Sequence, residues 1–386
     1  MQNWLLPEYI QDVLPDEAWR IEAMRARFLE MMRVHGYQLV APPLLEYAES
    51  LLIDDSADMN LRTFKLVDQL SGRTLALRAD ITPQVARIDA HLLNRQGVTR
   101  LCYAGSVLHT QPVGLTRTRE LLQIGAELYG HGGIESDLEI QRMMLQTLAL
   151  FGVADVHLDF GHVGVFRALV RQSGIGKALE GRLLAALQHK DVAGLQILVQ
   201  PLAPEIREAM LALSGLYGEC GDTLARARER LPAYPEIVAA IDALERACAH
   251  AQSRVAKVGI DLADLRGYHY HSGMVFAAYH AGSHDAIALG GRYDDLGKSF
   301  GRKRAATGFS LDLRQIYGLS PATAMQPGIC APALDDAALQ AKIANLRESG
   351  EIVVVDLLGE PGLKTELNCD RELVLRDGSW VVAPLN

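Results

Sequence analysis

The sequence has few cysteines, no long apolar run and no secretory start. Its five cysteines are odd in number and widely scattered, and none forms a Cys-x-x-Cys pair. This spacing indicates neither a disulfide framework nor a zinc cluster, and it favours a reducing cytoplasm. No apolar run approaches the roughly 20 residues of a membrane helix, and Met1–Glu17 lacks the basic start and apolar core of a signal peptide. We therefore predict a cytoplasmic protein without a membrane partner.

Positive charge is also in the minority. The chain has 38 Lys and Arg against 47 Asp and Glu, a formal net charge of -9. A surface that binds nucleic acid usually has a basic footprint, so we predict no nucleic-acid partner. No GxxxxGK[ST] phosphate loop is present, and the Gly290-Gly291-Arg292 run does not open a predicted helix. We expect no cofactor. At 386 residues the chain is long enough for two or three domains.

Residues 15–43 have the pattern of a helix, a strand and a proline stop. Apolar residues recur at helical spacing from Pro15 to Gly36, and a strand then runs to Ala41. Pro42-Pro43 ends the strand. Because proline lacks the N–H group that a central strand donates, this segment is expected at a sheet edge or an interface.

The stretch Thr74–Gly130 is the most closely marked part of the chain. We predict a hairpin over residues 63–78, a helix over 82–93 and a strand over 99–104. A polar loop with Arg117 and Arg119 is expected over 107–120, and a second strand over 121–130. Thr82 is expected to be the N-cap of the helix, with Pro83 at its first position. On the last strand, Gln123, Gly125 and Glu127 share one face because side chains alternate.

The rest of the chain alternates sheet and helix patterns. Ser136 and Glu139 match a capping box, residues 163–253 read as a helical insertion, and strand patterns resume from Val258 to Leu313. We predict an α+β core over residues 1–317 built on an antiparallel sheet. A linker at 318–334 and a small α/β domain at 335–386 follow, with Asp335 as a helix cap and a hairpin about Asp377-Gly378.

Asp80, Thr82, Gln123 and Glu127 form the first candidate site. Carboxylates and amides on one face accept hydrogen bonds from an ammonium group and an imidazole N–H. Such bonds contribute roughly 1.5–3 kcal/mol each when one partner is charged. The alternative is that these residues are solvated strand ends.

The stretch Asp264–Tyr279 is the second candidate. Arg266 beside a glycine suits a carboxylate ligand, and Tyr270 and His271 offer stacking faces and polar tips. His269 and His271 lie on the same face of a strand, which leaves a metal site as an open alternative. No carboxylate-histidine pattern completes such a site, and packed, hydrogen-bonded histidines are the other alternative.

These stretches together resemble histidyl-tRNA synthetase, a class II aminoacyl-tRNA synthetase, from about Leu5 to Tyr317. The matching stretches are TLALRADITPQVAR, QIGAELYG, RGYHYHSGMVF, GGRYD and ATGFSLDL. The resemblance implies a class II synthetase-like fold: a six-stranded antiparallel sheet flanked by helices, with a dimer interface built from the helix-plus-proline motif 1.

The resemblance also implies a histidine pocket. Asp80, Thr82 and Gln123 would hold the α-amino group, Glu127 the imidazole and Arg266 the carboxylate. Tyr270 and His271 stand where the synthetase has two tyrosines, and Asp80 stands where it has a glutamate.

Two arginines that bind ATP in the synthetase are missing from the matching positions. The stretch that matches Phe-Arg-x-Glu reads Val107-Leu108-His109-Thr110, and the second arginine falls on Arg314-Gln315. A one-residue shift along a strand would turn Arg314 to the opposite face. Losing one donor to a developing charge costs about 10²–10³-fold in rate. Aminoacylation should therefore be negligible.

A synthetase-like core with a histidine pocket, no ATP clamp and a small tail is similar to the regulatory subunits of ATP phosphoribosyltransferase. That resemblance implies a non-catalytic subunit of the first enzyme of histidine biosynthesis, with histidine as its allosteric ligand. The implied partners are the short-form catalytic subunit, in a hetero-oligomer, and a second copy of the chain. The alternatives are an active histidyl-tRNA synthetase and an orphan histidine-binding module.

Overall fold

The computed structural model describes residues 5–52, 57–112, 118–321, 326–360 and 366–385. The chain divides into two units, residues 1–321 and 322–386. The first unit has two sheets, and the second has one sheet with an apolar core of its own.

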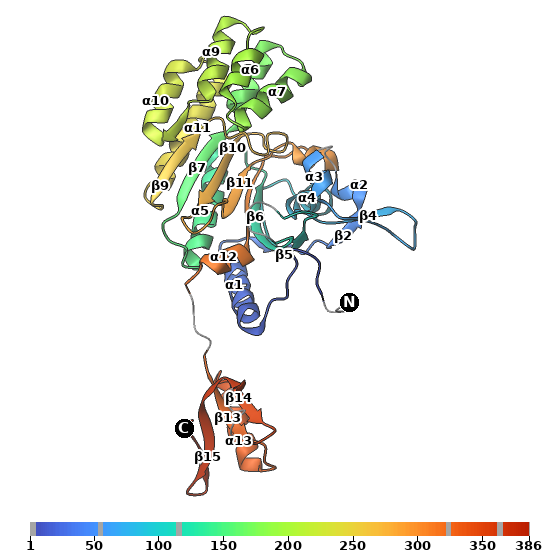
Figure 1. The fold of residues 1–386 in the computed structure, drawn as a ribbon, viewed down its shortest axis with the longest axis vertical. Helices are drawn as coiled ribbons and strands as arrows, with labels where there is room; N and C mark the ends of the chain where they lie inside the picture. Colours follow the sequence, from blue (N-terminus) through green and yellow to red (C-terminus); the bar gives the residue numbers. More distant parts are fainter. Residues whose placement is uncertain (1–4, 53–56, 113–117, 322–325, 361–365, 386) are drawn as a thin grey trace. The chain divides into compact units, whose positions relative to one another are not determined.

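A mixed sheet is the frame of the first unit (Figure 1). Among the described residues it has nine strands, in the order β1-β5-β6-β12-β11-β10-β7-β9-β8. In that order the strands are β1 (Gln38–Leu39), β5 (Thr99–Leu108), β6 (Glu120–Tyr129), β12 (Ala306–Asp312), β11 (Ala288–Arg292), β10 (Met274–Tyr279), β7 (His157–His162), β9 (Lys257–Asp261) and β8 (Tyr217–Glu219).

The six strands from β5 to β7 pair antiparallel throughout, which confirms the predicted centre of the sheet. The sheet as a whole is mixed, because β1 pairs parallel with β5 and β7 pairs parallel with β9. Parallel neighbours need a long crossover connection. The chain supplies one through the segment 40–98 and another through the helices between β7 and β9.

One face of this sheet is covered by apolar side chains and helices. Alternate residues of β6, such as Ile124 and Leu128, lie in the same core as Phe28 of α1 (Pro15–Val34) and Met144 of α5 (Ile134–Leu150). Full burial of such a side chain stabilises the fold by about 1.5–3 kcal/mol. Because strand side chains alternate, Gln123 and Glu127 must lie on the other face of the sheet.

The segment between β7 and β9 is mainly helical, and Figure 1 shows α6, α7, α9 and α10 grouped at one end of the sheet. The helices are α6 (Val163–Ser173), α7 (Lys177–Gln188), α8 (Val192–Leu198), α9 (Pro204–Leu213), α10 (Cys220–Arg230) and α11 (Pro235–Ala251). The sequence pattern missed the short strand β8 within this block. In the described part of the chain, no helix is both long and apolar enough to cross a membrane.

A disulfide joins Cys220 to Cys248, a pairing that the scattered spacing of the cysteines did not predict. The two cysteines are 28 residues apart in sequence, and this spacing matches no pairing motif. Packing of α10 against α11 brings their Cα atoms to 6.5 Å, which is within the range of bonded cysteines.

A smaller three-stranded sheet, in the order β2-β4-β3, lies beside the turn that carries Asp80. Its elements and the helices around it are β2 (Leu45–Tyr47), α2 (Ala48–Leu51), α3 (Ala57–Arg62), β3 (Lys65–Val67), β4 (Thr74–Leu77), α4 (Thr82–Arg87) and the π-helical turn η1 (Ile88–Leu93). The β3–β4 hairpin confirms the predicted one.

Two predicted helix caps in the first unit were wrong. The N-cap of α4 is Ile81, and Thr82 is the first residue of the helix, with its hydroxyl turned toward Glu127. The N-cap of α5 is Gly133 rather than Ser136, whose hydroxyl donates to the carbonyl of Gly133. Both side chains have tertiary partners, and sequence spacing does not report these.

The second unit is a four-stranded sheet with one helix. Its strands lie in the order β14 (Val353–Asp356), β13 (Gly328–Pro332), β15 (Cys369–Arg376) and β16 (Ser379–Pro384), and the helix is α13 (Ala337–Glu348). The hairpin at Asp377-Gly378 confirms the predicted one, and Asp336 rather than Asp335 caps α13. β13 lies inside the stretch 318–334 that we predicted to be linker, so the linker is shorter than predicted.

Candidate functional site

Four predicted site residues meet on the face of the large sheet that lies opposite α1 and α5. Gln123 and Glu127 project from β6, and Asp80 and Thr82 come from the turn that leads into α4. The Gln123 amide nitrogen lies 2.8 Å from Asp80 Oδ1, and Gln123 Oε1 accepts the Ile81 N–H at 2.9 Å. Thr82 Oγ1 lies 3.1 Å from Glu127 Oε1. The turn is therefore attached to the strand by side chains at both of its ends.

Glu127 is the most buried member of this group, with 1% of its surface exposed. Its carboxylate accepts hydrogen bonds from the hydroxyls of Thr82, at 3.1 Å, Tyr103, at 3.0 Å, and Tyr293. These donors are neutral. Burial raises the pKa of the Glu127 carboxyl to about 8, although the Tyr293 hydroxyl acts to lower it. None of these three hydroxyl donors carries a positive charge. A ligand that brings a positive charge or an N–H donor would therefore favour the ionised form of the Glu127 carboxyl.

We call Asp80, Thr82, Gln123 and Glu127, together with Tyr103 and Tyr293, the Glu127 cluster. The two tyrosines were not predicted. Tyr103 lies opposite Gly125 in the β5–β6 register, so strand pairing, once known, places it on this face. Tyr293 follows β11 and is distant in sequence, so only the tertiary fold brings its hydroxyl to Glu127.

Glycines on neighbouring strands leave room for the cluster. Gly308 on β12 pairs with Glu127, and a Cβ atom on Gly308 would coincide with the Glu127 carboxylate. A Cβ atom on Gly125 would collide with the Tyr103 hydroxyl. Both glycines are therefore required by close approach of side chains.

Tyr270 and His271 lie near this cluster in different ways. The Tyr270 ring packs 5.1 Å from the Tyr293 ring, and its buried hydroxyl has no hydrogen-bond partner among the described residues. The His271 ring fits between Gly267 and Gly291, and its Nδ1 lies 3.3 Å from a backbone carbonyl oxygen. Burial lowers the pKa of His271 to about 4, so this imidazole is neutral.

Arg266 is held by partners of its own. Its Nε lies 2.8 Å from Asp264 Oδ1, and one terminal nitrogen lies 2.6 Å from the Tyr279 hydroxyl. Among the described residues, the structure gives Arg266 no hydrogen bond to the Glu127 cluster. Of the seven predicted site residues, four are in direct contact, Tyr270 and His271 lie next to each other beside them, and Arg266 belongs to a separate group.

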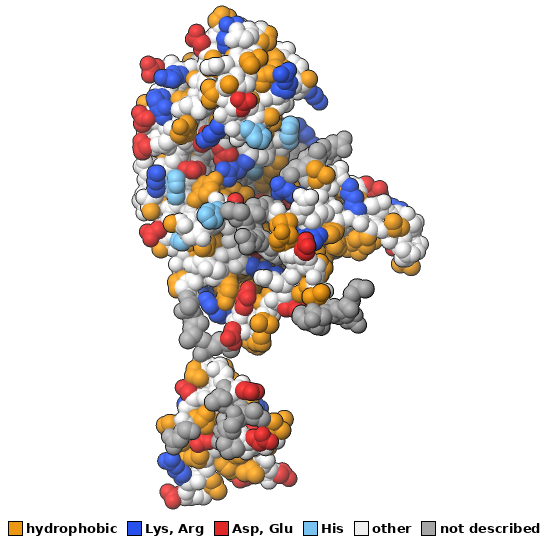
Figure 2. Space-filling model, in the orientation of Figure 1, with side chains coloured by type: hydrophobic (Ala, Val, Ile, Leu, Met, Phe, Trp, Pro, Cys, Tyr) orange, Lys and Arg blue, Asp and Glu red, His pale blue; other side chains and the backbone are white. Residues whose placement is uncertain are grey.

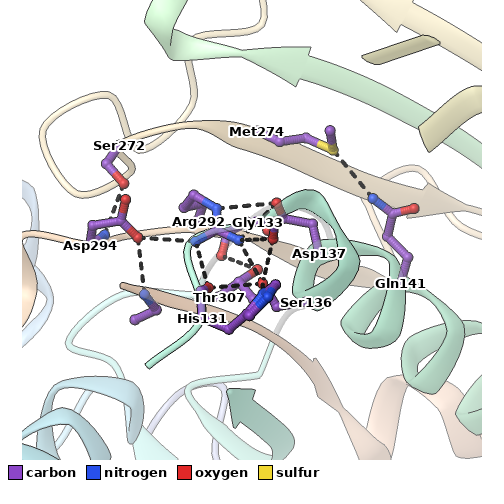
Figure 3. Close-up of polar contacts among 12 residues, drawn as sticks. His131, Gly133, Ser136, Asp137, Gln141, Ser272, Met274, Arg292, Asp294 and Thr307 are labelled. Carbon is purple, nitrogen blue, oxygen red and sulfur yellow. Dashed lines mark hydrogen bonds and ion pairs between the residues drawn. The ribbon is translucent and has the colours of Figure 1, made fainter. Parts of the chain in front are cut away.

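A buried arginine network supports Tyr293 (Figure 3). Arg292, which is 7% exposed, forms ion pairs with Asp137 at 2.9 Å and Asp294 at 3.3 Å. It also donates to the Ser136 hydroxyl at 2.8 Å. These contacts attach the end of β11 to α5. The position of the neighbouring Tyr293 therefore depends on the helix on the opposite face of the sheet.

The positions that the sequence resemblance matched to the synthetase's ATP-binding arginines make other contacts. Leu108 is the last residue of β5, and the Thr110 hydroxyl donates to the Leu61 carbonyl. Arg314 lies in the first turn of α12 (Leu313–Leu319), 3.5 Å from Glu120, so the argument from a one-residue shift on a strand was wrong. Arg117 of the predicted polar loop is outside the described residues.

The metal alternative for the histidine stretch gains no support from the geometry. Nowhere in the described ranges do three or more His, Cys, Asp or Glu side chains group so as to hold a metal ion. His269 instead packs edge-on against Tyr268, with ring centroids 5.4 Å apart.

The fold and the site together define a histidyl-tRNA synthetase-like core. A family model for histidyl-tRNA synthetase matches residues 9–316, and a model described as the ATP phosphoribosyltransferase subunit HisZ C-terminal domain matches residues 326–383. The solved histidyl-tRNA synthetase from Nostoc sp. PCC 7120 shares the fold, with a TM-score of 0.77 at 17% identity, over 100% of this chain and 97% of that one.

Full-length relatives narrow this class. A protein of Nitrosospira multiformis named ATP phosphoribosyltransferase regulatory subunit is 57% identical, over 99% of this chain and 98% of that protein. A protein of the same name from Ralstonia pickettii is 58% identical, over 100% of this chain and 98% of that protein. A crystal structure titled as an ATP phosphoribosyltransferase regulatory subunit/histidyl-tRNA synthetase from Bacillus halodurans C superimposes with a TM-score of 0.82 at 26% identity, over 94% of this chain and 96% of that one. The chain belongs to the family of ATP phosphoribosyltransferase regulatory subunits.

Proposed function

We propose that this chain is a non-catalytic regulatory subunit that binds histidine at the Glu127 cluster and controls a catalytic ATP phosphoribosyltransferase subunit. The family membership supports the regulatory role. The observation that carries the histidine site is the buried Glu127 carboxylate, which is surrounded by hydroxyls and lies beside Asp80 and Gln123. Histidine has an ammonium group and an imidazole N–H, which suit these acceptors.

Each predicted residue has a role in this proposal. Asp80, Thr82 and Gln123 receive the α-amino group, and Glu127 receives the imidazole. The unpartnered Tyr270 hydroxyl supplies one more polar contact, and the neutral His271 lines the site.

Arg266 meets the ligand carboxylate in this proposal, and it does so while it remains beside Asp264. Its contacts to Asp264 and Tyr279 fix the guanidinium plane and leave donors of the five-donor fork for a carboxylate.

The absence of aminoacylation in the proposal follows from the replaced ATP-binding positions. Leu108 and Thr110 contribute no cation there, Gln315 is neutral, and Arg314 is paired with Glu120. Without a positive clamp, the charge that develops on phosphate during adenylate formation has no stabilising partner at these positions.

The proposed partners are a short-form catalytic subunit and a second copy of the chain that meets the segment around α1 and β1. Figure 2 shows Lys and Arg side chains interspersed with Asp and Glu on the visible face, rather than gathered as they are on a surface that binds nucleic acid. Histidine would shift the complex toward the state it binds better, by no more than its difference in affinity between the states.

Reconstitution tests the function. Adding the chain to the short catalytic subunit should raise phosphoribosyl transfer to ATP, and histidine should inhibit the complex. Glu127→Ala should keep the activation and lose the inhibition, while Glu139→Ala, on the other side of the sheet, should keep both. Histidine-dependent ATP–pyrophosphate exchange by the chain alone would instead identify a synthetase. Failure of the catalytic subunit to copurify or to be activated would leave an orphan histidine-binding module.

Calorimetry tests the pocket. Histidine should bind the chain or its complex, and Glu127→Ala should weaken binding. Arg266→Ala should weaken histidine but leave histidinol, which lacks the carboxylate, unchanged. Equal losses for both ligands would remove the carboxylate role of Arg266, and no binding to either protein form would remove the sensor role.

A further inference from the structure

Arg78 is a buried cation next to the turn that carries Asp80. It is 7% exposed, and its Nε donates to the Ser106 carbonyl at 2.8 Å. One terminal nitrogen donates to the Pro42 carbonyl at 2.7 Å and lies 3.5 Å from Gln84 Oε1. All three acceptors are neutral oxygens. Among the described residues its hydrogen bonds reach no carboxylate, although Glu46, which is bonded to Gln84, acts on the guanidinium electrostatically. Burying a charge without a direct ion pair is costly, so a hydrophobic side chain would be the more stable choice if only packing mattered.

The backbone of Arg78 is bonded on both sides. Its N–H donates to the Leu44 carbonyl at 3.0 Å, and its carbonyl accepts the Leu108 N–H at 3.0 Å. Residue 78 therefore lies at the junction between the three-stranded sheet and β5 of the large sheet. Both its backbone and its side chain contact the segment Pro42–Leu44.

The guanidinium also lies over a glycine on the sheet face that carries Gln123 and Glu127. A Cβ atom on Gly105 would collide with a terminal nitrogen of Arg78. Gly105 pairs with Gln123 in the β5–β6 register, and Gln123 binds both Asp80 and the Ile81 N–H. The turn is thus held by Gln123 from one side and is anchored two residues earlier by Arg78.

We propose that Arg78 is a positioning residue that couples the Asp80–Thr82 turn to the Pro42–Leu44 segment. The proposal rests on histidine binding at the Glu127 cluster. Because Pro42–Leu44 follows the edge strand β1, which belongs to the proposed dimer surface, the coupling would link ligand occupancy to the neighbouring subunit. Such coupling is reciprocal and typically corresponds to about 5–150-fold in affinity.

Four variants separate positioning from general stability. Arg78→Met removes the guanidinium and keeps the stem, and Arg78→Lys keeps the charge without the fork. Gly105→Ala displaces the guanidinium without removing it. The double variant Arg78→Met/Gly105→Ala puts the methyl group where the guanidinium was. Arg100→Met is the matched control, since Arg100 is on the same strand as Gly105 but pairs with Glu139 of α5.

Calorimetry should show that Arg78→Met and Gly105→Ala each weaken histidine binding by roughly tenfold, within the usual range of such couplings. The double variant should be no weaker than Arg78→Met alone, and Arg78→Lys should recover part of the loss. Arg100→Met should bind as the wild type does. Wild-type affinity in both single variants, or additive losses in the double variant, would overturn the proposal.

A measurement without ligand keeps this test separate from the proposed function. Hydrogen exchange at the Ile81 and Thr82 amides, which donate to Gln123 and Asp80, should accelerate in Arg78→Met and not in Arg100→Met. If the wild type binds no histidine, the proposed function fails, and the exchange rates still report whether Arg78 positions the turn. Unchanged exchange in Arg78→Met, and equally in Arg78→Lys if the first variant does not fold, would refute the positioning role.

Discussion

Replacing Glu127 by glutamine should stabilise the ligand-free chain at alkaline pH, although Glu127 is the centre of the proposed site. Burial raises the pKa of this carboxyl from 4.5 to about 8, so the folded chain keeps a proton that the unfolded chain has released. The stability that this proton provides is complete below about pH 4.5 and is lost as the pH rises through about 8. At about 1.36 kcal/mol for each pKa unit, the loss amounts to about 5 kcal/mol. Glutamine has nearly the same volume and no proton to lose.

Urea denaturation followed by circular dichroism, over a series of pH values that spans both pKa values, measures this effect. The free energy of unfolding of the wild type should fall with rising pH relative to that of Glu127→Gln. Glu139→Gln is the control with the opposite sign, because the hydrogen bond from Arg100 lowers the pKa of Glu139. In the wild type, the stability that Glu139 contributes is present above its pKa in the unfolded chain. This stability is lost as the pH falls through its pKa in the folded chain. Parallel pH profiles for the wild type and Glu127→Gln would refute the reasoning.

Three further predictions concern stability and the shape of the site. Arg292→Met should lower the free energy of unfolding by about 3–5 kcal/mol in urea titrations, because Asp137 would remain buried without its partner. A loss below about 1 kcal/mol, which is the usual contribution of an exposed ion pair, would contradict this prediction. Gly308→Ala should abolish histidine binding in calorimetry by displacing the Glu127 carboxylate, and retained affinity would show that the site tolerates this displacement. Gly318→Ala, on α12 with open space around it, should instead stabilise the fold by about 0.5–1 kcal/mol in the same urea titrations, and any loss of stability would show an unexpected contact.

The short-range pattern of the sequence was sufficient to predict much of the fold. The alternation along β6 correctly put Gln123 and Glu127 on one face, and turn chemistry located the hairpin at Asp377-Gly378. Both predictions succeeded because strand alternation and left-handed turn residues are properties of a few consecutive residues. Helix caps failed where a polar side chain had a tertiary partner, as the Thr82 hydroxyl does in Glu127.

The family resemblance in the sequence indicated a site for a small polar ligand and the loss of the ATP-binding positions. Only the tertiary structure brought Tyr293 to Glu127, joined Cys220 to Cys248, and placed Arg78 over the face that carries the proposed pocket. These contacts join residues that are far apart along the chain, and their geometry depends on which strands pair and in which register. Sequence by itself therefore determined the kinds of groups available to the site, whereas packing decided which of them share a buried environment and how their charges are balanced.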